Sequence, residues 1–269
     1  MTELIDKNVQ VTGSALSRSE EALTSEMVAE RKQKMAWIAR VFSRTYSLTV
    51  VPSEHGGWSA GLDNEHLEEV EKYVMGQRPT LDGLPNSTFH PTQIHYDEKE
   101  VATKPEDEVL GVLRHEVGHV NNTDYRLFLE GQRWAQEQGV LPSTYAMAIN
   151  YPEDVWVNIR EIEDSTVVEQ QMKTRYAAST AEIIPHVSTQ PITHQLGLNV
   201  IYYWLTGENL PTLKDERVRS AFEQIKPALE EYFYGATPAD NHKLFREKIW
   251  PTFKVLEAQA QKDEAKDQI

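Results

Sequence analysis

Apolar side chains return every three or four positions through much of the chain, which is the spacing of one buried face on an α-helix. The clearest early example lies between residues 17 and 46. Its apolar positions are Met35, Ile38, Phe42 and Tyr46. Ser17 and Glu20 have the spacing of a capping box, which marks the start of a helix. We therefore expect a helix that begins at Ser17 and buries one stripe of side chains.

Two short segments have the composition of β-strands. Residues 47–51 are rich in β-branched side chains, and residues 88–96 alternate imperfectly between apolar and polar side chains. Turn residues and a short helix at 64–76 are expected between them. The pattern predicts a small sheet, in which the strand that ends near Tyr96 forms an edge where an extended peptide can pair.

Most of the remaining chain has helical patterns. Residues 105–121 begin with a proline and three acidic residues and end at two asparagines, which are typical start and stop signals. Further helices are expected near 125–138, 152–182, 192–206, 215–234 and 240–258. The predicted fold class is therefore α+β, with a small mixed sheet and one central helix in the N-terminal part and a mostly helical C-terminal part.

The chain is long enough for one large domain with a sizeable core. We expect residues 17–258 to form this domain, with an upper part at 17–122 and a helical lower part at 123–258. Residues 1–16 lack an apolar period and are predicted to be a mobile arm. Residues 259–269 are predicted to be a charged and frayed tail.

Charge and cysteine content narrow the possible classes of function. The formal net charge of −15 repels phosphates and anionic lipids, so neither a nucleic acid nor a membrane is an expected partner. No segment has the roughly 20 consecutive apolar residues of a membrane span, and the first residues lack the order of a signal peptide, which favours a cytoplasmic location. Because the chain has no cysteine, its metal ligands must be His, Asp or Glu.

Residues 115–119 read His-Glu-Val-Gly-His and match the HExxH pattern. Four residues make just over one helical turn, so His115 and His119 project from the same side of the helix and can share one zinc ion. Glu116 stands beside the first histidine, where its carboxylate can act as a general base. This pattern predicts a metal-dependent hydrolase.

Hydrophobic spacing on the same helix argues against an accidental match. Its apolar stripe consists of Val109, Leu110, Leu113, Val117 and Val120. The two histidines point well away from this stripe, so they are not ordinary core residues. Gly111 and Gly118 border the histidines, where small residues let another segment or a substrate approach.

A catalytic zinc site needs a third protein ligand and one open position. The downstream candidates are Asp124, Glu130, Glu153, Asp154, Glu161, Glu163 and Asp164. Glu153 and Asp154 stand together, directly after Pro152. Acidic residues in a first helical turn also suit the positive end of the helix dipole, so this pair can have a purely structural reason.

The segments at 115–125 and 150–158 resemble the gluzincins, whose third zinc ligand is a glutamate on a second helix. They are particularly similar to predicted metallopeptidases that often occur with von Willebrand A-type domains. The resemblance implies a zincin-like fold, a Zn²⁺ cofactor and hydrolysis of peptide bonds. The metzincin pattern does not fit, because Asn122 and Tyr125 stand where that pattern has a glycine and its last histidine.

The same resemblance implies the ligand set. His115, His119 and Glu153 would hold the metal, and Asp154 or Asn158 would orient a ligand by hydrogen bonding. The alternative third ligand is Asp154, in which case Asn158 takes the place four positions after the ligand that gluzincins give to an acidic residue.

The leading prediction is a zinc metallopeptidase that acts on a peptide or protein substrate, with Glu116 as general base and then general acid. The rival is a non-catalytic regulatory or assembly partner protein that binds metal on a zincin scaffold. A third prediction is a metal-free helical interaction protein. Residues that could stabilise an oxyanion, each of which also suits a structural role, are His90, His95, His186, His194, Tyr151, Tyr176, Tyr202 and Tyr203.

Overall fold

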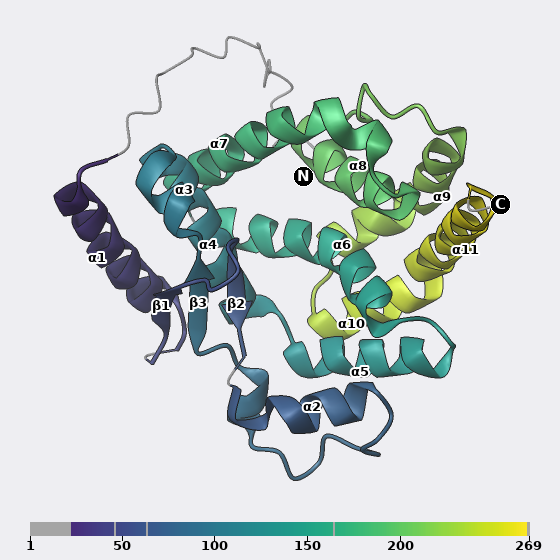
Figure 1. Ribbon diagram of the computed structural model, residues 1–269, viewed down its shortest axis with the longest axis horizontal. Coiled ribbons are helices and arrows are strands. Elements are labelled where there is room, and N and C mark those ends of the chain that lie inside the picture. Colours follow the sequence, from purple (N-terminus) through teal and green to yellow (C-terminus); the bar gives the residue numbers. More distant parts are fainter. Residues whose placement is uncertain (1–22, 46, 63, 164, 268–269) are drawn as a thin grey trace.

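The described residues form a small sheet in the N-terminal part, with the mostly helical C-terminal part to one side of it (Figure 1). The computed structural model describes residues 23–45, 47–62, 64–163 and 165–267. Several predicted features lie outside the described residues. They are the arm at 1–16, the capping pair Ser17 and Glu20, and the apolar position Tyr46. Helix α1 (Ser25–Phe42) begins later than predicted, because the Thr24 hydroxyl accepts a backbone hydrogen bond from its first turn. The mostly helical content with one mixed sheet confirms the α+β prediction.

Three short strands form the sheet, in the order β1-β3-β2. They are β1 (Thr49–Pro52), β2 (Ser59–Gly61) and β3 (Gln93–Tyr96). β3 pairs in parallel with β1, where Val50 lies opposite Ile94, and antiparallel with β2, where Ala60 lies opposite Ile94. The prediction of a free edge at Tyr96 is therefore wrong, because β3 is paired on both sides. β2 was missed because Ser-Ala-Gly has no strand pattern.

The N-terminal core lies between α1, the sheet and α4 (Glu106–Asn122). All five residues of the apolar stripe predicted on α4 are buried in this core. Met35 and Ile38 of α1 are buried with them, whereas Phe42 is 45% exposed and stacks on the Arg114 guanidinium. Each fully buried aliphatic side chain contributes roughly 1.5–3 kcal/mol, so this stripe fixes the rotation of α4 and hence the direction of its histidines.

A second and larger core joins most of the helices that follow α4. The remaining α-helices are α2 (Leu67–Val74), α3 (Glu98–Thr103), α5 (Tyr125–Glu137), α6 (Pro142–Ile162), α7 (Thr166–Ile183), α8 (Ile192–Thr206), α9 (Glu216–Phe233), α10 (Pro238–Leu244) and α11 (Trp250–Asp267). Shorter turns are η1 (Asn64–His66), η2 (Asn86–Phe89), η3 (Ile184–Thr189) and the π-helical η4 (Phe245–Ile249). Figure 1 shows α4 and α6 at the centre of the molecule, and these two helices are in direct contact. None of the helices in the described ranges is long and apolar enough to cross a membrane.

The predicted helix at 152–182 divides into α6 and α7. α6 begins ten positions earlier, at Pro142, and keeps Pro152 in its interior rather than at its start. α7 has its own start, because the Ser165 hydroxyl accepts a hydrogen bond from the Val168 backbone N–H. The last helix also extends further than the predicted 240–258, since α11 continues to Asp267 within the segment predicted as a charged tail.

Candidate metal centre

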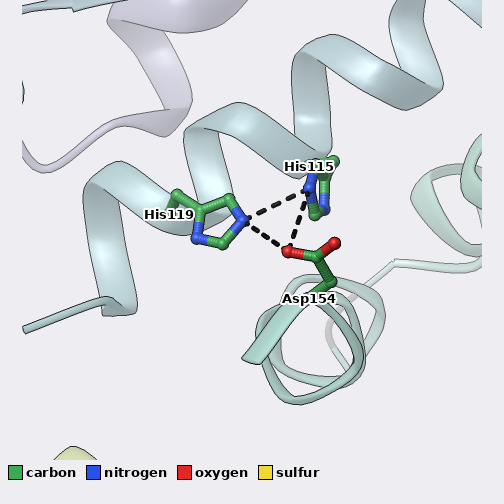
Figure 2. A group of neighbouring side chains, drawn as sticks. All are labelled: His115, His119 and Asp154. Atoms are coloured by element: carbon green, nitrogen blue, oxygen red, sulfur yellow. Dashed lines mark hydrogen bonds and ion pairs between the residues drawn. The ribbon is translucent and has the colours of Figure 1, made fainter. Parts of the chain in front are cut away.

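Three side chains from two helices bring their ligand-type atoms together (Figure 2). His115 and His119 extend from α4, and Asp154 reaches them from α6. The two Nε2 atoms lie 3.2 Å apart, and Asp154 Oδ1 lies 3.2 Å from His119 Nε2 and 3.7 Å from His115 Nε2. The side chains are only 10–16% exposed. The histidine pair predicted from HExxH thus meets a carboxylate from a distant segment.

Hydrogen bonds behind the two rings set the position of each ring proton. Asn158 Oδ1 lies 2.8 Å from His115 Nδ1 and can only accept, so His115 Nδ1 carries the proton. The Thr123 hydroxyl donates to Glu153 at 3.0 Å and therefore accepts from His119 Nδ1, which is 2.9 Å away. Both Nε2 atoms are left with lone pairs that face each other and the carboxylate. Three facing acceptors repel one another unless a cation or protons lie between them.

Burial keeps the two imidazoles neutral at neutral pH. It lowers the pKa of His115 to about 4, although the nearby Asp154 acts in the opposite direction. Burial likewise lowers the pKa of His119. The pKa of Asp154 is raised to about 6 by burial, so this carboxyl is mostly ionised at pH 7. The centre therefore offers two neutral imidazoles and one carboxylate, the protonation states in which these groups bind metals.

The spacing of these atoms fits a tetrahedral metal ion. Zinc–nitrogen and zinc–oxygen bonds of about 2.0–2.2 Å place neighbouring tetrahedral ligands about 3.3–3.6 Å apart. The three observed separations, 3.2, 3.2 and 3.7 Å, lie close to this range. Two histidines and one carboxylate also leave a fourth coordination position open, which is the arrangement of catalytic zinc sites.

Glu153, the first choice for third ligand, lies outside this group. It is 1% exposed, and its two carboxylate oxygens accept hydrogen bonds from Thr123 at 3.0 Å and from Tyr232 of α9 at 2.7 Å. Successive residues on a helix point about 100° apart, so only one of the two neighbouring acids can face α4. The structure brings the alternative, Asp154, to the histidines and uses Glu153 to hold Thr123 against His119.

Glu116 lies on the side of the centre that faces the sheet. It is buried and accepts a hydrogen bond from the backbone N–H of Ala60 in β2. Burial is the main cause that raises its pKa to about 8, and the negative charge of Asp154 adds to the effect. Without a cation nearby, Glu116 is therefore mostly protonated at pH 7, and a metal ion at the centre would lower its pKa and give the carboxylate that a general base needs.

Three of the predicted oxyanion residues lie close to the centre. The Tyr176 hydroxyl is 3.3 Å from His115 Nδ1, and its ring meets the His115 ring edge-on. Tyr151 stands one turn before Asp154 on α6, and its hydroxyl is 3.0 Å from His194 Nδ1. Asp154 is among the causes that raise the pKa of Tyr151 to about 12, after burial.

The other candidate residues from the sequence do not belong to the three-residue group. The Tyr203 hydroxyl donates to Glu230, and His186 lies in η3. Asp124 caps α5, Glu130 pairs with Arg126, and Glu161 accepts from Asn121 and Asn122. The remaining ones, none of which belongs to the three-residue group, are His90, His95, Tyr202 and Glu163. Asp164 lies outside the described residues.

Gly111 and Gly118 are the positions where other helices approach α4. A Cβ on Gly118 would lie 2.5 Å from a methyl group of Val157 on α6, and a Cβ on Gly111 would lie 2.4 Å from the backbone oxygen of Gln171 on α7. The close approach predicted at these two glycines is therefore made by other helices of the protein. It lets Asp154 reach the histidines and brings α7, which carries Tyr176, to the back of His115.

Gly111→Ala is expected to destabilise the protein although alanine favours helices. The new methyl group meets backbone, which moves less easily than a side chain, and the overpacking outweighs the helix propensity gained. We expect the free energy of unfolding in urea to fall by about 1–2 kcal/mol. Val167→Ala on the exposed side of α7 is the control and should change it by less than about 0.5 kcal/mol. Equal stability of the two variants would contradict the tight contact.

Comparison with protein-family models, with curated proteins and with solved structures finds no match to this chain. Only the chemistry and geometry of the centre itself therefore indicate a function.

Proposed function

We propose that this protein is a zinc metallopeptidase in which His115, His119 and Asp154 hold Zn²⁺. The observation that carries this proposal is the convergence of three lone pairs, with the ring protons placed on the far side by Asn158 and Thr123. Such partners fix the orientation of metal-binding histidines. A structural role for the group would not require that its three acceptors face one another.

The catalytic role falls to Glu116. When bound, Zn²⁺ supplies a Lewis acid that lowers the pKa of a water toward about 7 and polarises a carbonyl group. With the metal bound, Glu116 would be the carboxylate that takes a proton from the attacking water and returns it to the leaving amine, so it would end as it began. The hydrogen bond from Ala60 holds one side of the carboxylate, which limits its rotation during both transfers.

A peptide is the substrate that best suits the surroundings. β2 is an edge strand, and its Ala60 touches Glu116, so an extended peptide that pairs with β2 lies across the centre. A hollow of about 330 Å³ lies at Thr123, behind the His119 ring, and has room for a substrate side chain, whereas His115, His119, Asp154 and Glu116 do not line it. Its walls include Phe89, Thr123, Tyr125 and Pro238.

Tyr151 and His194 are the pair best placed to stabilise the oxyanion of the substrate. They share a hydrogen bond, and Tyr151 lies on the same face of α6 as Asp154, three positions earlier. A phenol beside the metal centre can donate to the oxygen on which negative charge develops. Tyr176 is less suited, because its hydroxyl contacts the rear nitrogen of His115.

Removing the metal is the direct test of the proposal. We expect 1,10-phenanthroline to abolish cleavage of a mixed peptide pool, measured by mass spectrometry, and added zinc to restore it. Cleavage that survives complete removal of metal would refute a metallopeptidase. Zinc binding without cleavage of any peptide would instead favour the regulatory or assembly partner protein.

A further inference from the structure

A second hollow lies away from the metal centre and shares no wall residue with it. It has a volume of about 230 Å³ and lies between α5 and the segment formed by α10 and η4. The walls are Leu127, Ala239, His242, Lys243, Arg246 and Glu247. Three of these six side chains are basic, although the whole chain has a formal net charge of −15.

Polar groups at this hollow are buried without partners. His242 is 2% exposed, and neither of its ring nitrogens has a hydrogen bond within the described residues. The same holds for Nε and Nη2 of Arg246. Leaving a buried polar group without a partner costs about 1–3 kcal/mol, and more for a charged group. The Tyr145 hydroxyl contacts the Arg246 guanidinium, but neither the His242 ring nor Nε and Nη2 of Arg246 have a hydrogen bond among the described residues, so an acceptor from outside the chain can complete their bonding.

The charges of the walls favour an anion. Among the described residues, neither Lys243 nor Arg246 takes part in an ion pair, and Glu247 is the one acidic side chain of the hollow. The Arg246 guanidinium is held over the Trp134 ring, 5.7 Å from its centroid. Burial lowers the pKa of His242 to about 4, so at neutral pH this ring is uncharged and offers one N–H donor.

The backbone brings these side chains to one side. His242 and Arg246 are four positions apart, about one turn, and η4 is a π-helical segment between α10 and α11. π-Helical turns are rare and occur frequently at functional sites. A planar guanidinium, an imidazole N–H and an ammonium group on one wall form a typical set of donors for a tetrahedral oxyanion.

We propose that this hollow, here called the α10 site, binds a phosphate-type oxyanion through His242, Lys243 and Arg246. The ligand is free inorganic phosphate or the phosphoryl group of a larger molecule, which share the same donors. The α10 site does not depend on the proposed peptidase activity, because none of its residues belongs to the metal centre.

Titration of inorganic phosphate into the full-length protein by calorimetry tests the α10 site. Lys243→Ala and Lys248→Ala form a matched pair, because each removes one exposed lysine from the same segment but only Lys243 lines the hollow. We expect Lys243→Ala to weaken phosphate binding about fivefold or more and Lys248→Ala to change it less than about twofold. Arg246→Met, with folding checked by circular dichroism, should remove binding.

Binding at the metal centre must be separated from binding at the α10 site. The His115→Ala protein should bind phosphate as tightly as wild type, since His115 does not line the α10 site. Loss of binding in His115→Ala, equal effects of the two lysine variants, or no phosphate binding by wild type would each overturn the proposal. A phosphorylated peptide that binds more tightly than phosphate, with the same dependence on Lys243, would identify the larger ligand as the source.

Discussion

Asp154→Asn is expected to remove zinc from the purified protein, whereas Glu153→Gln is expected to leave about one equivalent bound. Asp154 contributes the oxygen that faces both histidines, while both oxygens of Glu153 are engaged by Thr123 and Tyr232. Each change replaces a carboxylate by its amide without altering size, so the two variants differ only in which acid is removed. Elemental mass spectrometry of the dialysed proteins measures the result.

Zinc affinity, like zinc content, should distinguish Asp154 from Glu153. Loss of a group that orients a ligand typically weakens metal binding about 10- to 100-fold, so Glu153→Gln should lower the affinity without emptying the centre. His115→Ala should behave like Asp154→Asn. Circular dichroism confirms that each variant is folded. Full zinc in Asp154→Asn together with none in Glu153→Gln would restore Glu153 as the ligand and contradict the geometry.

The choice between the two acids shows where sequence reasoning stopped. Pro152 is typical of the start of a helix, and this pattern predicts that the two acids after it lie in a first turn. In the structure Pro152 lies ten residues inside α6, and the rotation of a long buried helix decides which acid faces α4. That rotation depends on side chains of other helices that the periodicity of one segment does not reveal.

The positions of the two histidines on α4 were predictable for a physical reason. Its apolar stripe and its histidines are within seventeen residues of one helix, so the helical period alone relates them. Thr123 lies four positions after His119, so the same helical period could have predicted that it lies beside the His119 ring. Ala60 and Tyr232 were not, because they reach the centre from segments far away in the chain that carry no motif.

The small sheet illustrates the same limit. Residues 49–52 and 93–96 form strands as expected, but the three residues of β2 owe their conformation to pairing with β3 rather than to their own composition. Because β2 went unseen, the free edge was assigned to the wrong strand. Its position matters for function, since β2 contacts Glu116 and offers the outer edge.

Glu116→Gln is expected to abolish peptide cleavage while zinc content stays at about one equivalent. Glutamine keeps the size of the side chain and can still accept the Ala60 hydrogen bond, but it has no carboxylate to take a proton. General acid–base catalysis typically contributes about 10²- to 10⁴-fold, so kcat should fall at least to that extent with little change in KM. Cleavage of a peptide pool by the zinc-loaded proteins is followed by mass spectrometry.

Glu108→Gln is the matched control for this prediction. Glu108 lies on α4, two turns before Glu116, is partly buried and, like Glu116, has its pKa raised mainly by burial. The same chemical change at Glu108 removes the same charge from the same helix without touching the centre, so it should preserve cleavage. If Glu116→Gln and Glu108→Gln cleave equally well, Glu116 is not the base, and the proton must be taken by another group of the centre. Because both variants keep His115, His119 and Asp154, a difference between them is due to proton transfer and not to loss of the metal.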